Sequence, residues 1–240
     1  MGPVVICAAT FPELALLIRS IGARKRGGRA GRETYAGSIG KQKVVLAVTG
    51  IGKVNTASAL TVLLETSAPR LVINVGCAGA FTESGLRVGD LAVASAEVYG
   101  DEGVQTPDGW EPLDLIGIPS FERKGVRYFN EFPLAKLPAE QAVQLAGALG
   151  ITARRGRFLT VSTCSGTLRR GDELFRRFSP LCENMEGAAA AHVSLIYGVD
   201  CLEVRGISNM VEDRDLSRWN IPLAVEKAQR FILKFLETYP

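Results

Sequence analysis

The sequence predicts an α/β fold in which a central mixed, mostly parallel sheet is flanked by helices. Short apolar runs alternate with segments of helical periodicity along almost all of the 240 residues. Some of these runs are continuously apolar, as in strands that are buried on both faces. Because no internal repeat or low-complexity linker interrupts the alternation, we expect residues 1–240 to form a single domain.

The N-terminal part of the chain predicts elements whose type follows from the spacing of their apolar residues. Continuous or alternating apolar runs indicate strands, and apolar residues three or four positions apart indicate helices. Gly22 and Pro69 end the two helices, since each residue disfavours their continuation. In order, the expected elements are strand Val4–Ala8, helix Pro12–Ile21, hairpin strands Glu33–Ile39 and Lys43–Thr49 around Gly40, helix Val54–Glu65 and strand Leu71–Val75.

The C-terminal part continues the same alternation. Pro138 at a first helical turn and Gly150 after the last turn delimit one helix clearly. The expected elements are strand Asp90–Tyr99, helix Pro138–Leu149, strand Phe158–Ser162, helices Leu168–Phe178 and Met185–Tyr197, strand Leu202–Ile207 and helix Pro222–Leu236.

Asp101–Phe132 does not fit this alternation. The segment is rich in Gly, Pro and acidic residues, and segments of this length are lids, binding loops or interface elements unless they are plain surface excursions. Its apolar residues lie in a pattern too irregular to be buried within the segment, so we expect a homodimer or a higher homo-oligomer. These residues are Trp110, Leu113, Leu115, Ile116, Ile118 and Phe121.

The composition is that of a globular protein, with 47% apolar and 22% charged residues, and it excludes disordered and fibrous chains. A net charge of +3 is too small to indicate nucleic-acid or membrane partners. The apolar runs are shorter than the ~18 residues of a membrane-spanning helix, and the first residues lack the pattern of a signal peptide. Five widely spaced cysteines without a C-x-x-C pair suit reduced thiols, which predicts a cytoplasmic protein.

The single histidine limits the possible chemistry. His192 excludes a site with several histidine ligands, and its small-residue surroundings favour a structural role. The Gly50–Gly52 segment does not match a dinucleotide or phosphate loop, because Asn55 and Val54 stand where Gly and Ser or Thr are required. We therefore expect no metal and no organic cofactor.

Carboxylates and amides near strand ends are the candidate catalytic groups. Ligands of open α/β sheets bind at the carboxyl ends of the strands. Glu13 follows the first strand, Asn209 follows the last, and Glu186 lies in an apolar stretch. Considered alone, Glu13 is consistent with a carboxylate that stabilises a helix N-terminus by its charge. Glu186, considered alone, is consistent with a buried carboxylate that needs hydrogen bonds.

Four segments in matching order give the sequence a family resemblance. They resemble the nucleoside phosphorylase/nucleosidase superfamily, in particular its methylthioadenosine/S-adenosylhomocysteine nucleosidase branch, and they extend over nearly the whole chain. The resemblance implies the fold of nucleoside phosphorylases and cleavage of an N-glycosidic bond. The segments are Val48-Thr49-Gly50-Ile51-Gly52-Lys53-Val54-Asn55, Ile73-Asn74-Val75-Gly76-Cys77-Ala78-Gly79, Asn184-Met185-Glu186-Gly187-Ala188 and Val204-Arg205-Gly206-Ile207-Ser208.

Two departures from the family pattern narrow the expected reaction. Asn74 stands where phosphorylases of the superfamily carry a phosphate-binding arginine, so the expected nucleophile is water. Asn209 stands where adenine-cleaving nucleosidases carry an aspartate, and an amide suits a 6-oxopurine because it can donate as well as accept. In this respect the sequence is similar to the futalosine hydrolases of menaquinone biosynthesis, which release hypoxanthine from futalosine.

The resemblance also implies roles for individual residues. Glu13 would polarise the attacking water, Glu186 would accept hydrogen bonds from the ribose hydroxyls, and Asn209 would hold the base. The remaining expected substrate contacts are Met185 against the ribose, Arg205 and Cys77 near the water and sugar, Thr163 and Cys164 around the base, and Trp219 on the 5′ side of the sugar. Ile51 is a further expected substrate contact.

Three other functions stay open at this point. Two belong to the superfamily: a purine nucleoside phosphorylase acting on inosine, and a methylthioadenosine/S-adenosylhomocysteine nucleosidase. The third is a purine-binding regulatory module without enzymatic activity, whose nucleic-acid contact would be the basic stretch Arg19–Arg32. Glu13 and Glu186 favour an enzyme over such a module.

Overall fold

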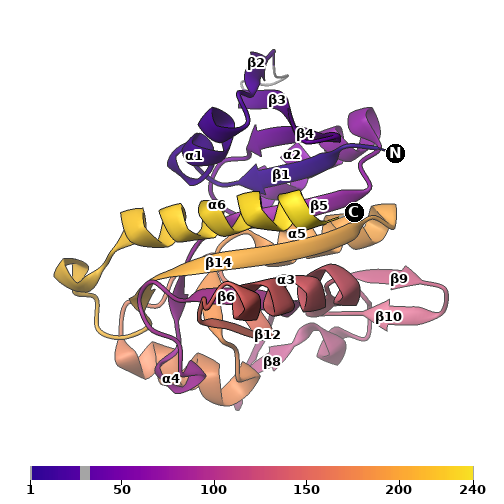
Figure 1. The fold of residues 1–240 in the computed structure, drawn as a ribbon. Coiled ribbons are helices and arrows are strands. Elements are labelled where there is room, and N and C mark those ends of the chain that lie inside the picture. Colours follow the sequence, from indigo (N-terminus) through magenta and orange to yellow (C-terminus); the bar gives the residue numbers. More distant parts are fainter. Residues whose placement is uncertain (1, 28–32, 240) are drawn as a thin grey trace.

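The computed structural model describes residues 2–27 and 33–239. Its largest sheet has ten strands, with the order β11-β6-β12-β13-β5-β1-β4-β3-β2 and with β14 beside both β5 and β6 (Figure 1). These strands are β1 (Val4–Ala8), β2 (Arg24–Arg26), β3 (Glu33–Ile39), β4 (Gln42–Val48), β5 (Leu71–Ala80), β6 (Leu91–Tyr99), β11 (Glu131–Pro133), β12 (Ala153–Thr160), β13 (Cys182–Asn184) and β14 (Asp200–Met210).

Parallel and antiparallel pairs share this sheet. Parallel pairs join β1 to β4 and β5, β12 to β6 and β13, and β14 to β5. Antiparallel pairs form both edges and join β13 to β5 and β14 to β6. The path β6-β12-β13-β5-β14 therefore returns to its start as a closed circuit of strands.

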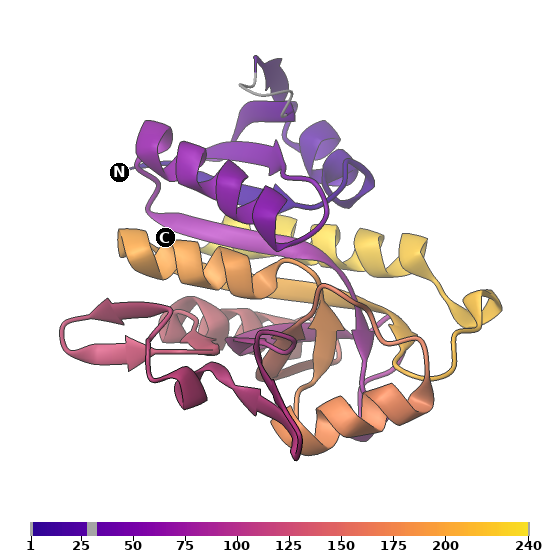
Figure 2. The same ribbon diagram turned by 180° about the vertical axis from the view of Figure 1, so that it is seen from behind.

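Helices cover both faces of the sheet. α1, α3 and α6 lie on the face seen in Figure 1, and α2 and α5 lie on the face seen in Figure 2. The helices are α1 (Pro12–Ser20), α2 (Lys53–Ser67), α3 (Lys136–Ala148), α4 (Leu168–Phe178), α5 (Gly187–Tyr197) and α6 (Ile221–Thr238), with 3₁₀ turns at Thr82–Ser84, Leu113–Ile116 and Leu216–Arg218.

The expected α/β fold with a central mixed sheet is confirmed, and β1 illustrates its cause. Successive side chains of a strand point to opposite faces. Val4 and Ile6 accordingly pack with the apolar residues of α1 and α6, while Val5 and Cys7 pack with those of α2 and α5. The continuous apolar run thus supplies one row of side chains to each of the two cores.

The helix expected over Met185–Tyr197 begins two residues later, at Gly187. The Asn184 side chain terminates the preceding strand, because its Oδ1 accepts hydrogen bonds from the backbone N–H groups of Glu186 (2.9 Å) and Gly187 (2.6 Å). Met185 and Glu186 therefore lie in the turn before α5, where their side chains can face a ligand.

Asp101–Phe132 is more regular than its sequence indicates. It forms two hairpins, β7 (Gly103–Thr106) with β8 (Gly109–Pro112) and β9 (Phe121–Arg123) with β10 (Val126–Tyr128), and then enters β11. Strands of three or four residues are too short to show a period, which is why the alternation of side chains was not visible. Leu115, Ile116 and Ile118 on this segment remain exposed, by 56%, 50% and 72%.

The basic stretch Arg19–Arg32 is described only in part, since residues 28–32 lie outside the described residues. Arg24–Arg26 form the edge strand β2, and Lys25 pairs with Glu33 on the neighbouring strand. No helix in the described part of the chain has the length and apolar character needed to cross a membrane.

Candidate active site

A cavity of about 330 Å³ opens where β1, β5, β13 and β14 end. Nine of the ten expected site residues line it: Glu13, Ile51, Cys77, Cys164, Met185, Glu186, Arg205, Asn209 and Trp219. Thr163, the tenth, is exposed and is not among the lining residues. The structure thus brings together residues that are almost 200 positions apart in the chain.

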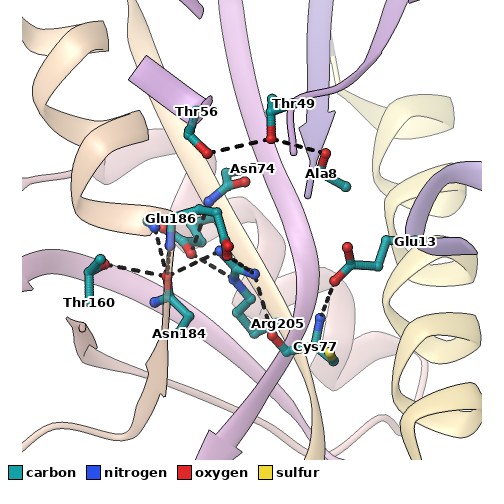
Figure 3. Close-up of polar contacts among 12 residues, drawn as sticks. Ala8, Glu13, Thr49, Thr56, Asn74, Cys77, Thr160, Asn184, Glu186 and Arg205 are labelled. Atoms are coloured by element: carbon teal, nitrogen blue, oxygen red, sulfur yellow. Dashed lines mark hydrogen bonds and ion pairs between the residues drawn. The ribbon is translucent and has the colours of Figure 1, made fainter. Parts of the chain in front are cut away.

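Glu13 is buried at the start of α1 and is held at both of its carboxylate oxygens. Its Oε1 accepts the Cys77 N–H at 3.1 Å (Figure 3). Its Oε2 accepts the backbone N–H (2.9 Å) and the hydroxyl (2.8 Å) of Thr10. The close approach depends on Gly76, because a Cβ there would lie 2.5 Å from Glu13 Oε1. A glutamate whose only role was to stabilise the N-terminus of α1 by its charge would need none of these hydrogen bonds.

Arg205 is the buried cation of the site, with 2% of its side chain exposed. Its Nε donates to Glu203 Oε1 (2.8 Å), its Nη2 donates to Asn184 Oδ1 (3.3 Å), and its Nη1 lies 3.5 Å from Glu186 Oε2. Burial by itself would lower the pKa of Arg205. The neighbouring carboxylates of Glu203 and Glu186 raise this pKa by a larger amount, so the net shift is upward. The guanidinium is therefore permanently charged.

Glu186 links this cluster to the glycine-rich loop before α2. Its Oε1 accepts the Gly52 N–H at 2.9 Å. Gly52 has φ of +92°, a left-handed conformation that costs glycine little, and the conformation turns its N–H toward the carboxylate. The loop thus holds a carboxylate of the protein where a phosphate-binding loop would hold a phosphate.

Two further carboxyl groups lie behind Arg205, among buried polar side chains. Glu97 accepts hydrogen bonds from Asn184 Nδ2 (2.6 Å) and the Thr160 hydroxyl (2.7 Å), and Glu203 accepts one from Asn74 Nδ2 (3.1 Å). Burial, and for Glu97 also the Glu203 charge, raises the pKa of both carboxyl groups. This network supports Arg205 from the side that faces away from the cavity.

Asn74 belongs to that network and does not line the cavity. Its amide bonds to Glu203 and lies 3.6 Å from the Cys7 thiol. Asn74, which stands where the family pattern has a phosphate-binding arginine, therefore forms its hydrogen bonds inside the core.

Asn209 is held by its neighbours in one amide orientation. Its Nδ2 donates to the Met210 carbonyl (3.0 Å), and its Oδ1 accepts the Ser208 hydroxyl (2.8 Å). One N–H of the amide remains for a ligand. Gly79 on β5 makes room for the side chain, because a Cβ there would lie 2.9 Å from Asn209 Nδ2.

Several lining residues were not expected from the sequence, above all Glu183 and Ser165. Glu183 is buried and accepts two hydrogen bonds from Ser165, from its N–H (2.9 Å) and its hydroxyl (2.7 Å). A possible signal was the polar pair Glu183-Asn184 between Cys182 and Met185. Arg214 was also missed, and its guanidinium lies 4.6 Å from the centre of the Trp219 ring at the cavity wall.

Of the thiols and the histidine, only Cys77 and Cys164 line this site, and the Cys77 thiol hydrogen-bonds with Ser208. All five cysteines are free, as expected, and burial raises the pKa of Cys77 to about 11. His192 stacks on Phe132 with ring centres 4.1 Å apart, outside the cavity. Within residues 2–27 and 33–239, no group of three or more His, Cys, Asp or Glu side chains is placed to hold a metal ion.

A family model described as the phosphorylase superfamily matches residues 3–237. The chain belongs to the phosphorylase superfamily. This superfamily member is 35% identical over 188 residues to a futalosine hydrolase of Thermus thermophilus, with 78% of this chain and 79% of that protein covered. It is 33% identical over 179 residues to a 5′-methylthioadenosine/S-adenosylhomocysteine nucleosidase of Halalkalibacterium halodurans, with 74% and 72% covered.

Solved structures of the superfamily have the same fold. An S-adenosylhomocysteine nucleosidase of Streptococcus pyogenes in complex with 5-methylthiotubericidin is 25% identical, with a TM-score of 0.86 over 100% of this chain and 98% of that one. A methylthioadenosine/S-adenosylhomocysteine nucleosidase of Neisseria meningitidis is 20% identical, with a TM-score of 0.85 over 99% and 100%. The expectation that this superfamily member is a nucleosidase, an N-glycosyl hydrolase, is confirmed by these relatives.

Proposed function

We propose that the protein hydrolyses the N-glycosidic bond of a 6-oxopurine nucleoside, and that its substrate is futalosine, from which it releases hypoxanthine. The observation that carries this proposal is the fixed amide of Asn209. Because the Met210 carbonyl and the Ser208 hydroxyl hold the amide, its free N–H faces the cavity as a donor for O6 or N7 of the base. The futalosine hydrolase among the relatives supports the same substrate.

The proposed mechanism follows from the charges that develop in the transition state. Cleavage of the bond builds positive charge on the ribose and negative charge on the leaving base, so carboxylates near the sugar and donors near the base stabilise it. Glu13, fixed by the Cys77 and Thr10 bonds, polarises the attacking water. Glu186 accepts hydrogen bonds from the ribose hydroxyls, and Asn209 donates to the base as it leaves.

Water is the proposed nucleophile because the cavity does not suit a phosphate dianion. Three carboxylates line it, those of Glu13, Glu183 and Glu186, against the guanidinium groups of Arg205 and Arg214. Arg205 is already bonded to carboxylates, and Asn74 is turned into the core. A phosphate would therefore meet net negative charge, at a cost that grows inside a site shielded from solvent.

Methylthioadenosine and S-adenosylhomocysteine are the second candidate substrates, because two of the similar relatives are nucleosidases for them. The test is a panel of futalosine, aminofutalosine, inosine and methylthioadenosine, each with and without phosphate, scored for the free base. We expect phosphate-independent release of hypoxanthine from futalosine. Aminofutalosine should have a kcat/KM lower by roughly 10- to 10⁴-fold, because a buried donor then faces another donor.

A substitution of Asn209, the residue proposed to bind the base, makes the substrate test more specific. In Asn209→Asp, a carboxyl oxygen takes the place of the Nδ2 that donates to the Met210 carbonyl, which favours the protonated carboxyl. Its other oxygen can accept from the 6-amino group of adenine, so the preference should move toward adenine nucleosides. Equal kcat/KM for futalosine and aminofutalosine in the unmodified protein would contradict the proposal, as would a rate that collapses without phosphate.

The proposal includes a cytoplasmic location and a homo-oligomer. Free cysteines suit a reducing compartment. The exposed apolar residues of Asp101–Phe132 suit a contact with a second copy of the chain.

A further inference from the structure

Glu183 and Asn209 flank the same residue of β5. Gly79 pairs with Glu183 of β13 on one side and with Asn209 of β14 on the other. Paired residues of neighbouring strands project from the same face of a sheet, and both side chains line the cavity. Two strand spacings separate the backbones of Glu183 and Asn209 by roughly 9–10 Å. Because Glu183 and Asn209 line one cavity of about 330 Å³, a single flat ring bound there can reach both polar groups.

The carboxylate of Glu183 is buried and lacks a full set of partners. Only 7% of the residue is exposed, and each oxygen accepts one hydrogen bond from Ser165. No ion pair to Glu183 is present among the described residues. Burial raises the pKa of Glu183, while the two Ser165 bonds and the Arg170 charge lower it. A buried carboxylate with acceptor positions left over is costly unless a ligand supplies a donor.

We infer that Glu183 is a specificity-determining residue that accepts the N1–H of a 6-oxopurine while Asn209 donates to O6 or N7 of the same ring. The inference rests on the proposed function and names the second group that selects its base. In a 6-oxopurine a donor at N1 adjoins the O6 acceptor, whereas in adenine an acceptor at N1 adjoins an amino donor. An ionised carboxylate only accepts, so it binds the first pattern and opposes the second.

Ser165 positions Glu183 in this arrangement. Its N–H and its hydroxyl bind one carboxylate oxygen each, so the carboxylate plane is fixed before a base arrives. Such preorganisation means that a mismatched base cannot be accommodated by rotating the side chain. Ser165→Ala keeps the N–H and removes the hydroxyl, and it should weaken the discrimination partly.

The test is calorimetric binding of free hypoxanthine, 1-methylhypoxanthine and adenine to the whole protein. The unmodified protein should bind hypoxanthine at least about 10-fold more tightly than either other base, since each leaves a buried acceptor unpaired. In Glu183→Gln, the amide oxygen can still accept the Ser165 N–H, and an amide N–H then faces the cavity. The ratio of hypoxanthine to adenine affinity should fall by about 10²-fold, and the penalty for the 1-methyl group should shrink.

Glu83→Gln is the matched control, because Glu83 is exposed in the 3₁₀ turn Thr82–Ser84 outside the cavity, and its ratios should equal those of the unmodified protein. An unmodified protein that binds adenine more tightly than hypoxanthine contradicts the proposed function and this inference with it. A hypoxanthine preference that Glu183→Gln leaves unchanged overturns the role of Glu183 alone. If Glu183→Gln does not fold, equal binding of hypoxanthine and 1-methylhypoxanthine by the unmodified protein overturns the inference.

Discussion

Arg205 shows how a single residue organises the site. Its guanidinium joins Glu203 and Asn184 behind the cavity to Glu186 at the cavity wall. Each of these groups is buried, so each would be costly without the others. The charge that pairs with Glu186, a proposed catalytic carboxylate, therefore also stabilises the interior next to it.

Arg205→Met should remove both the pairing with Glu186 at the cavity wall and the stabilisation of the buried groups behind it. The carboxylates of Glu203 and Glu186 would be left buried without their cation, which costs about 3–5 kcal/mol of the free energy of unfolding. Urea unfolding measures this loss. The control is Arg218→Met, whose exposed pair with Glu212 (2.7 Å) should change the free energy of unfolding by no more than about 1 kcal/mol. Equal effects of the two substitutions would show that Arg205 does not balance the buried carboxylates.

Glu13→Gln tests the proposed base with little change in shape. The amide can keep the bond from the Cys77 N–H, but its NH₂ group then faces the Thr10 N–H, and the base is lost. Turnover should fall by about two orders of magnitude or more, while the thermal unfolding midpoint stays close to that of the unmodified protein. Steady-state kinetics on the nucleoside that the panel identifies provides the measurement, and wild-type turnover would reduce Glu13 to a structural carboxylate.

At the scale of elements, β5 is the strand that separates the polar groups of the candidate site. Gly76 lies in it between Glu13 and Arg205, and Gly79 lies between Glu183 and Asn209. The two glycines are three residues apart. At each of them, polar atoms of the site occupy the space that a Cβ would fill. The missing side chains of the strand thus make room for the polar groups of Glu13, Arg205 and Asn209.

Gly76→Ala should therefore impair activity more than folding. The added Cβ would lie 2.5 Å from Glu13 Oε1 and 2.7 Å from Arg205 Nη1, so both charged groups must move. We expect kcat to fall at least about 10-fold, since displaced catalytic groups lose their alignment. Gly147→Ala is the control: no atom lies within 4 Å of its Cβ, and alanine favours α3, so it should stabilise the protein by about 0.5–1 kcal/mol. Unchanged kcat in Gly76→Ala would show that the site tolerates this displacement.

Elements were predictable where many residues repeat one pattern. β1, β3 and α4 have the bounds that their sequences indicate: β1 is one continuous buried run, α4 has a helical period, and β3 ends at the turn of Gly40. β13 has three residues, too few to show a period. In the candidate site, position at strand ends and the family resemblance indicated Glu13, Glu186 and Asn209. The Glu183–Ser165 bond was not indicated, because it depends on a sheet register that local spacing does not reveal.

For the whole molecule, the β9–β10 hairpin of Asp101–Phe132 projects from the body of the fold (Figure 2). Leu115, Ile116 and Ile118 are exposed on this segment. Exposed apolar residues grouped in this way are typical of a surface that contacts another protein. We take a second copy of this chain as the partner, because a homo-oligomer requires no other protein.

Light scattering at micromolar concentration should therefore give a mass of at least twice the 25.7 kDa of one chain. Ile118→Lys places a charge on the proposed contact and should shift the mass toward the monomer. Leu137→Lys serves as control, because Leu137 is 63% exposed but lies in α3, outside the segment. A monomeric mass for the unmodified protein would refute the homo-oligomer.

The pairing of β5 with β14 has a consequence for synthesis on the ribosome. The two strands pair along ten registered positions, yet β5 is complete at Ala80 and β14 only at Met210. At the usual ~5–20 residues per second, translation leaves one edge of this apolar strand without its final neighbour for roughly 7–26 s. An uncovered apolar strand edge can pair with other chains. The nascent protein therefore has a period of vulnerability to aggregation that ends when its last strand emerges, and the same strand delivers Arg205 and Asn209 to the cavity.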